Sequence, residues 1–318
     1  MLEKIILFNL SSNPELVRKI ANLLRLSVGH VELMHFSDGE VMARSLDSVR
    51  GKSVYIIQST CSPASERLME LLVFIDGIKK ASAKDINVII PYYGYSRQDR
   101  IARPREPISA RLVADLLQTV GVSHLITVDL HTPQIQGFFS CPVDNLSTIH
   151  LFAKYYTKKL KQLKIDPSEV VVVSPDHGSA HRGRDLATAL PNSQLAIVDK
   201  RRPSPNEAEV VNIVGDVQGK TCIIIDDIID TGGTIVASAN ELYAKGAREI
   251  LVAASHGVFS RNNVEAMKNA GISDIVVTDS IEKSIPGVNV ITISEVLSHV
   301  ITHNESGTSL PPEYLAFY

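Results

Sequence analysis

The chain has 318 residues, which is more than a single hydrophobic core usually serves, and this length favours two domains of about 150 residues each. Hydrophobic residues make up 44% and charged residues 21%, values that exclude a disordered or fibrous chain. The formal net charge of -3 gives no overall attraction to nucleic acid or to an anionic membrane, so neither is expected as a partner.

The cysteines and the N-terminal segment indicate in which cellular compartment the protein resides. The cysteines are odd in number, widely spaced and form no Cys-x-x-Cys pair, which argues against a disulfide framework and a thiolate zinc site: Cys61, Cys141 and Cys222. The apolar run at residues 5–8 is too short for a signal peptide, and no later stretch approaches a membrane span. We therefore expect a cytoplasmic protein.

In the first half of the chain, short β-branched runs alternate with amphipathic helical patterns, which is typical of βαβ units around a mostly parallel sheet. Residues 4–8 predict a strand, and residues 14–24 predict a helix with Asn13 as its cap and Pro14 at its first position. Further strands are predicted at 54–58, 87–91 and 125–130, with helices at 66–80 and 108–120.

A second series of strands follows a helix predicted at residues 150–164, so we place a domain boundary near residue 148. The prediction is an α/β protein with an N-terminal domain at 1–148 and a C-terminal domain at 149–318. Pro-Tyr-Tyr-Gly at 91–94 and Pro-Asp-His-Gly at 175–178 each follow an apolar strand and indicate a weak internal duplication. The strands of the second half are predicted at 170–174, 194–199, 222–226, 250–254 and 275–277.

Residues 223–234, Ile-Ile-Ile-Asp-Asp-Ile-Ile-Asp-Thr-Gly-Gly-Thr, pass from a hydrophobic strand into an acidic, glycine-containing turn before a helix. Gly232 and Gly233 allow backbone amides to approach an anion, and the helix that follows contributes its unsatisfied N-terminal amides and dipole. Thr231 and Thr234 add hydroxyl donors. The turn therefore predicts a phosphate site.

Asp226 and Asp227, at the carboxyl edge of the same strand, suit sugar hydroxyls, bound directly or through magnesium. An ordinary capped turn explains a lone glycine pair equally well, but three acids within five positions favour a phosphate and sugar site. The sequence contains neither a P-loop nor a dinucleotide-binding fingerprint.

This segment resembles the phosphoribosyl diphosphate loop that phosphoribosyltransferases share with ribose-phosphate pyrophosphokinases. Other motifs resemble those of the bacterial class I pyrophosphokinases, in matching order across nearly the whole chain: Phe36-Ser37-Asp38-Gly39-Glu40, Tyr95-Ser96-Arg97-Gln98-Asp99-Arg100, Asp129-Leu130-His131 and Asp199-Lys200-Arg201-Arg202-Pro203. The resemblance implies two similar domains of phosphoribosyltransferase type, each a mostly parallel sheet flanked by helices, with the last helix able to pack back on the N-terminal domain.

The resemblance also implies roles for individual residues. ATP binding is implied for Phe36, whose ring would stack on adenine, and for Asp38, Gly39, Glu40, Arg97, Gln98 and Asp99. Ribose 5-phosphate binding is implied for Arg202, Asp226, Asp227, Asp230, Thr231, Gly232, Gly233 and Thr234. Magnesium ligation is implied for His131 and Asp176, and catalysis for Lys200 and Arg202 as transition-state stabilisers.

The implied reaction transfers the diphosphate of ATP to the 1-hydroxyl of ribose 5-phosphate, with Mg²⁺ as cofactor, and serves nucleotide biosynthesis. The resemblance also implies a homo-oligomer, often a hexamer. A phosphoribosyltransferase would share the glycine-containing turn, but the ATP-side motifs and the second domain argue against it. A non-catalytic homologue would keep the fold, but the intact motifs argue against that alternative.

Several of these residues have ordinary structural alternatives. Phe36 could fill the core, His131 could be a structural histidine, and residues 200–202 could be a solvated charge run on a polar, proline-flanked loop. Ser179, His181 and Gly183 depart from the family pattern, and we expect a less regular helix there.

Overall fold

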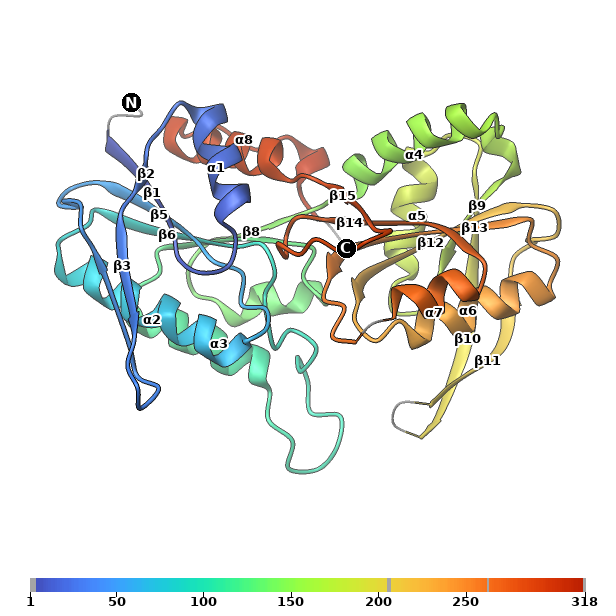
Figure 1. Cartoon of the computed structure of the whole chain (residues 1–318), viewed down its shortest axis with the longest axis horizontal. Coiled ribbons are helices and arrows are strands. Elements are labelled where there is room, and N and C mark those ends of the chain that lie inside the picture. The colour runs from blue at the N-terminus through green and yellow to red at the C-terminus, as the bar shows by residue number, and fades with distance from the viewer. Residues whose placement is uncertain (1–3, 205–206, 262, 317–318) are drawn as a thin grey trace. The chain divides into compact units, whose positions relative to one another are not determined.

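Figure 1 shows the computed structural model of the chain, which describes residues 4–204, 207–261 and 263–316, without the side chains of residues 200–211. The described chain divides into two compact units. Unit 1 contains residues 4–147, 279–282 and 292–316, and unit 2 contains residues 148–278 and 283–291. Within these residues, no helix combines the length and the apolar character needed to cross a membrane.

Unit 1 is built on a sheet whose strands run in the order β2-β1-β5-β6-β7-β8, all of them parallel. β3 and β4 form a separate antiparallel hairpin. Helices α2 and α3 lie on one face of the sheet and α1 and α8 on the other (Figure 1). The elements are β1 (Ile5–Asn9), α1 (Pro14–Leu24), β2 (Val28–Gly29), β3 (Val31–His35), β4 (Val41–Ser45), β5 (Ser53–Ile57), α2 (Ala64–Lys80), β6 (Asp85–Ile90), α3 (Ser109–Val120), β7 (His124–Val128), β8 (Val143–Leu146) and α8 (Ser294–Ser306), with short 3-10 helices at Pro133–Phe138 and Pro312–Tyr314.

The first helix has the predicted bounds, and Asn13 occupies its N-cap position without the capping hydrogen bond from its side chain. α1 spans Pro14–Leu24 and buries the apolar face expected from its spacing. The Asn13 side chain does not cap the helix. Its oxygen instead accepts a hydrogen bond from the Ser59 amide at 3.0 Å, and its amide group donates to the Ser280 carbonyl at 3.1 Å. Because Asn13 is fully buried, these contacts with distant segments satisfy it better than a local cap would.

Helix α8 lies far along the chain but packs against β5 of unit 1. Glu305 accepts hydrogen bonds from the Ser53 hydroxyl at 2.6 Å and the Tyr55 hydroxyl at 2.9 Å. The Asn304 amide group donates to the same Tyr55 oxygen at 2.6 Å. These polar contacts fix the position of α8 on the sheet, in addition to the apolar residues that it buries.

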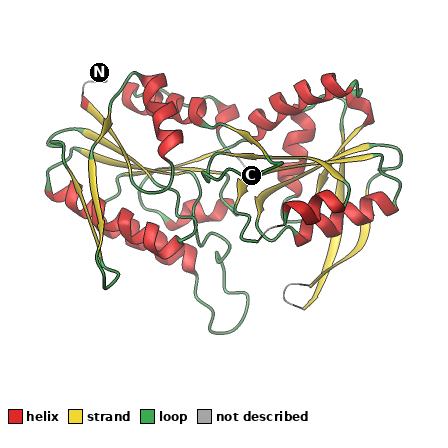
Figure 2. Ribbon diagram, viewed as in Figure 1, coloured by secondary structure: helices red, strands yellow, loops and turns green. Residues whose placement is uncertain are grey.

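Unit 2 has a sheet in the order β11-β10-β9-β12-β13-β14-β15, parallel except for the antiparallel pair β10 and β11. Figure 2 shows helices on both faces of the sheet. Alternate residues of β9 explain this arrangement, because Val171 and Val173 pack into the core with α6 and α7, whereas Val170 and Val172 pack with α4 and α5. The elements are α4 (Ile149–Leu163), β9 (Val170–Ser174), α5 (Ala180–Ala189), β10 (Gln194–Ser204), β11 (Glu207–Val214), β12 (Thr221–Ile229), α6 (Gly233–Ala244), β13 (Glu249–Gly257), α7 (Val264–Asn269), β14 (Ile272–Thr278) and β15 (Asn289–Ile291), with a short 3-10 helix at Pro167–Glu169.

Two expectations for unit 2 are wrong. The backbone of residues 200–203 is not a loop, because β10 continues to Ser204 and pairs with β11. The helix around Gly183 is not irregular either, since α5 runs unbroken from Ala180 to Ala189. A Cβ at Gly183 would lie 3.0 Å from Leu195 Cδ1 and 3.3 Å from Ser174 Cβ, so glycine permits α5 to pack closely on the sheet.

Gly94 allows a similarly close approach in unit 1. Its amide donates to the Thr60 hydroxyl at 2.7 Å, and a Cβ at this position would overlap the Thr60 carbonyl oxygen.

We expect Gly94→Ala to destabilise the protein by about 1–3 kcal/mol, because the backbone must move apart to admit the methyl group. Thermal unfolding measures the effect. The matched control is Gly77→Ala in α2, where the Cβ would meet only the Ala43 carbonyl oxygen at 3.8 Å, and where stability should rise slightly. A Gly94→Ala protein as stable as the original would contradict this close packing.

Candidate active site

Asp226 and Asp227 lie within β12, which continues to Ile229, whereas the sequence analysis ended this strand at Asp226. The Asp227 amide donates a hydrogen bond to Asp226 Oδ1 at 2.9 Å. The Asp227 side chain is buried, with 6% exposure. The two carboxyl groups therefore lie side by side in the half of β12 that leads to the carboxyl edge of the sheet.

Asp176 follows β9, the parallel neighbour of β12, and so belongs to the same edge of the sheet. Its Oδ1 accepts hydrogen bonds from the Ser179 amide and the Ser179 hydroxyl, both at 2.9 Å. Its carbonyl oxygen accepts a further bond from the Ser174 hydroxyl at 2.7 Å. Ser179, which departs from the family pattern, thus holds Asp176 in place.

Asp226, Asp227 and Asp176 interact electrostatically, as the pKa of Asp226 indicates. Burial raises the pKa of Asp226 well above its usual range, and the neighbouring charges of Asp227 and then Asp176 raise it further. The structure therefore brings one expected magnesium ligand, Asp176, electrostatically close to two expected sugar ligands. A concentration of carboxylates of this kind fits a hard cation, which would offset their mutual repulsion.

The turn after β12 presents donors to solvent. Gly232 has a φ of 75° and precedes α6, which begins at Gly233. The left-handed backbone of Gly232 suits glycine, whereas Gly233 lies outside that region, and its Cβ would meet only Thr231 Oγ1 at 3.9 Å. Thr231 and Gly233 are exposed, and the first amides of α6 have no acceptors within the helix. The geometry of residues 230–234 therefore suits an anion, as the sequence indicated.

Asn263 supports this turn, and the sequence analysis missed it. Its amide group donates a hydrogen bond to the Asp230 carbonyl oxygen. A Cβ at Gly232 would lie 3.1 Å from the same amide nitrogen. Asn263 precedes α7 and is distant from the turn in sequence, so only the topology of unit 2 brings the two segments together.

In unit 1, residues 36–40 form the exposed turn between β3 and β4. The Phe36 amide donates to the Glu40 carbonyl at 2.8 Å, and the Gly39 amide donates to the Phe36 carbonyl at 2.9 Å. Asp38 Oδ1 accepts a bond from the Glu40 amide at 3.1 Å. Phe36 is 46% exposed, so it does not fill the core, and its ring is accessible for stacking.

Arg97, Gln98 and Asp99 lie in the long segment between β6 and α3, where Arg97 and Gln98 are exposed. Gln98 Oε1 accepts a bond from the Ser109 hydroxyl at 2.5 Å. Asp99 Oδ2 accepts one from the Thr132 hydroxyl at 2.7 Å, so it is joined to the residue that follows His131. The structure thereby links the expected ATP segment to the expected magnesium segment within unit 1.

The two segments expected to bind ATP, residues 36–40 and 97–99, are both connected to the first turns of α2 through neighbouring residues. The Tyr95 hydroxyl lies 2.8 Å from the Ser65 hydroxyl, and His35, which precedes Phe36, contacts Glu66 and Glu70. Lys200 and Arg202 have backbones in β10, but their side chains lie outside the described residues. His131 belongs to unit 1 and Asp176 to unit 2.

Comparisons with known proteins identify the family. Residues 5–121 match the family model described as the N-terminal domain of ribose phosphate pyrophosphokinase, and residues 167–311 match the phosphoribosyl synthetase-associated domain. The ribose-phosphate pyrophosphokinase of Bacillus subtilis is 47% identical to this chain over 309 residues, which cover 95% of each. This chain belongs to the ribose-phosphate pyrophosphokinase family.

Further relatives agree with this assignment. The ribose-phosphate pyrophosphokinase of Bacillus caldolyticus is 49% identical over 300 residues, 93% of each chain. The crystal structure of a phosphoribosylpyrophosphate synthetase from Mycobacterium smegmatis has a TM-score of 0.88 and 38% identity, covering 96% of this chain and 99% of that one. The family and the α/β fold of two similar domains predicted from sequence are thus confirmed.

Proposed function

We propose that the protein transfers the diphosphate group of ATP to the 1-hydroxyl of ribose 5-phosphate, giving 5-phosphoribosyl 1-diphosphate and AMP. In a member of this family, one feature of unit 2 carries the proposal. The carboxylates of Asp176, Asp226 and Asp227 gather at one edge of its sheet, next to the glycine-containing turn at residues 230–234. Nucleotide biosynthesis consumes the product.

The turn at 230–234 would bind the 5-phosphate of the sugar. The amides at the start of α6 and the Thr231 hydroxyl offer donors, and Gly232 holds the backbone in the required conformation. Asp226 and Asp227 would accept hydrogen bonds from the ribose hydroxyls, which orients the 1-hydroxyl.

ATP would bind to residues of unit 1, with adenine stacked on Phe36. The exposed phenylalanine ring and the turn stabilised by Asp38, Gly39 and Glu40 support this role. Arg97, Gln98 and Asp99 would contact the nucleotide as well, and the exposed position of the first two supports such contacts.

Asp176 and His131 would each act as a magnesium ligand of its own unit, and the carboxylates beside Asp176 fit a divalent cation. When bound, it supplies positive charge to phosphate oxygens. Lys200 and Arg202 would stabilise the charge that develops as the sugar oxygen attacks the β-phosphorus and AMP leaves. No covalent enzyme intermediate is required, and no residue is assigned as a general base. We further propose a cytoplasmic homo-oligomer, a hexamer by family resemblance.

Incubation with ATP and ribose 5-phosphate tests this function directly. We expect AMP and 5-phosphoribosyl 1-diphosphate in equal amounts, with the reaction stopped by a magnesium chelator and restored by excess Mg²⁺. A phosphoribosyltransferase would instead consume the sugar diphosphate in the presence of a nucleobase. A non-catalytic homologue would form neither product, and either of these results would overturn the proposal.

Gly233→Val tests the position of the sugar phosphate. The added side chain meets no close atom of the protein, so the fold should tolerate it, but it would occupy space in front of the α6 amides. We expect the apparent affinity for ribose 5-phosphate to fall by at least about 10-fold, since charge-assisted hydrogen bonds to phosphate are lost. Steady-state kinetics with each substrate varied in turn measures the change, and affinity for ATP should change less. Gly232→Val is the contrasting control, because its left-handed φ should make the substitution destabilising. If the folded Gly233→Val protein keeps its affinity for the sugar phosphate, the phosphate lies elsewhere.

A further inference from the structure

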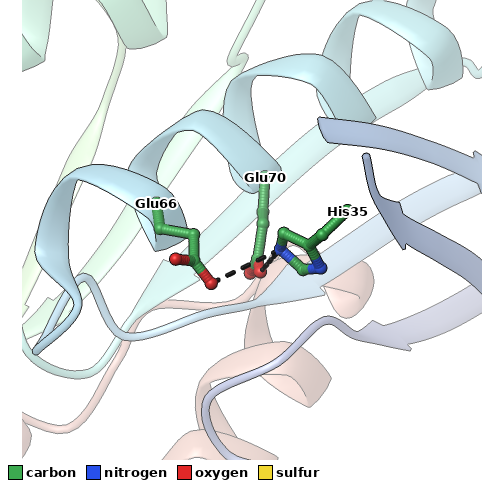
Figure 3. A group of neighbouring side chains, drawn as sticks. All are labelled: His35, Glu66 and Glu70. Carbon is green, nitrogen blue, oxygen red and sulfur yellow. Dashed lines mark hydrogen bonds and ion pairs between the residues drawn. The ribbon is translucent and has the colours of Figure 1, made fainter. Parts of the chain in front are cut away.

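A cluster of three side chains in unit 1 is not used by the proposed reaction. His35 at the end of β3 faces Glu66 and Glu70 on α2, and we call these residues the His35 cluster (Figure 3). His35 Nε2 lies 3.0 Å from Glu70 Oε1 and 3.4 Å from Glu66 Oε1. One ligand atom from each of the three side chains lies within 4.8 Å of the others.

The two separations from His35 Nε2 match those between ligands that share a metal ion. A tetrahedral Zn²⁺ site with ligand bonds of about 2.0–2.2 Å places neighbouring ligand atoms about 3.3 Å apart. Glu66 and Glu70 are four residues apart on α2, and this spacing puts both carboxylates on one face of the helix. His35 approaches that face from the adjoining hairpin, so all three donors converge on one position.

The second oxygen of Glu70 is held by neighbouring groups. Glu70 Oε2 accepts hydrogen bonds from Gln58 Nε2 at 2.7 Å and from the Ser11 hydroxyl. Its side chain is 1% exposed, whereas those of His35 and Glu66 are 41% and 50% exposed. The buried carboxylate is thus oriented with Oε1 toward the cluster, as outer hydrogen bonds orient ligands in metal sites. The exposed side of the cluster gives an ion and its water ligands access.

The charge of the cluster also favours a cation. Among the described residues, His35 is the only group that forms an ion pair with Glu66 or Glu70. A buried carboxylate such as that of Glu70 is costly to leave without a compensating charge, and a divalent ion shared by Glu66 and Glu70 would offset the charge of both.

We propose that the His35 cluster binds a divalent transition-metal ion of the Zn²⁺ type, at a site separate from the magnesium of the proposed reaction. The imidazole ligand favours Zn²⁺ or Co²⁺ over Mg²⁺, which prefers oxygen donors. The ion would join the end of β3 to α2 and so hold the turn that begins at Phe36.

Titration with Co²⁺ in a large excess of Mg²⁺ tests the site, because Mg²⁺ fills oxygen-rich sites while Co²⁺ reports imidazole ligation through its visible absorption. We expect one Co²⁺ per chain that Zn²⁺ displaces, and a rise in melting temperature with Zn²⁺. His35→Gln and Glu66→Gln should each weaken binding by at least about 10- to 100-fold, as for losses in metal coordination. Glu66 is half exposed, so its variant should fold even if His35→Gln does not.

His30→Gln is the matched control, because His30 also contacts a carboxylate, Asp47, at 3.2 Å but has no second one among the described residues. It should leave Co²⁺ binding unchanged. Equal Co²⁺ binding by the original protein and both cluster variants would overturn the proposal, as would an equal loss in His30→Gln. A melting temperature of the original protein that does not respond to Zn²⁺ would also overturn it.

Discussion

Replacing Lys200 or Arg202 by alanine is expected to lower turnover by about 100- to 1,000-fold, because a cationic donor would be lost from the site of developing charge. The loss should appear in the chemical step more than in the affinity for ATP or ribose 5-phosphate. Stability should barely change. The backbone of both residues belongs to β10, where Lys200 pairs with Val210 of β11, and an alanine keeps the strand intact.

Single-turnover kinetics and thermal unfolding of the same preparations check both parts of this expectation. Arg201→Ala is the matched control, since it removes the same charge from the same strand at a residue with no implied role. Full turnover in the Lys200 and Arg202 variants would show that residues 200–202 are a solvent-exposed charged segment without a catalytic role. A large drop in melting temperature with activity per folded molecule retained would indicate a structural role instead.

The parallel strands and the helices that cover them could be predicted because burial leaves a strong pattern in the sequence. β9 is five buried residues, four of them valine, and α1 repeats its apolar residues with helical spacing. The β3–β4 hairpin was missed because most of its side chains are partly or fully exposed, which weakens the alternation that marks a strand. The hydrophobic pattern along one strand reflects the burial of its side chains, but it does not show which other strand it pairs with.

Charged and proline-containing segments misled the sequence analysis for a related reason. Residues 200–203 were expected to form a loop, yet their backbone continues β10 as one strand of an antiparallel hairpin. Hairpin partners need only backbone hydrogen bonds, so a polar composition does not exclude them.

The candidate site was predicted in its motifs but not in its supporting contacts. The acids of β12 and the glycine-containing turn were evident because strand, acids and glycines are consecutive. Asn263, which braces that turn, and Glu70, which faces His35, are distant in sequence from their partners. Neither contact follows a local pattern, so only the folded topology reveals it.

Asp226→Asn is expected to stabilise the protein in the absence of magnesium and substrates, even though it should impair activity. Burial and the charges of Asp227 and Asp176 raise the pKa of Asp226, so its ionised form opposes folding. A carboxyl group with a raised pKa contributes its full stability only below the pKa of the unfolded chain, about 3.9. That contribution is lost as the pH rises through the folded pKa. Asparagine is never ionised, so the variant should exceed the original protein in stability at pH 7–8, and the difference should shrink as the pH falls.

Thermal unfolding across this pH range, in a chelator, measures the effect, with a shift of about 2–4 °C for each kcal/mol. Asp274→Asn is the matched control. Asp274 is also an acid of unit 2 and is buried, but Lys159 Nζ lies 3.0 Å from it and the Tyr155 hydroxyl donates to it at 3.0 Å. Its neutralisation should therefore lower stability. An Asp226→Asn protein that is less stable at pH 8 than the original would mean that a cationic or donor group within the protein already compensates the carboxylate edge.

The same variant separates stability from function. If Asp226 accepts a hydrogen bond from ribose, its replacement should lower kcat/KM for ribose 5-phosphate by about 10- to 100-fold, the equivalent of losing one charge-assisted hydrogen bond. Added Mg²⁺ and ribose 5-phosphate should raise the melting temperature of the original protein more than that of the variant, because binding relieves a repulsion that the variant lacks. Opposite changes in stability and activity would mark Asp226 as a residue retained for ligand binding at the expense of the unliganded fold. A variant with unchanged kcat/KM would show that the acids of β12 do not contact the sugar.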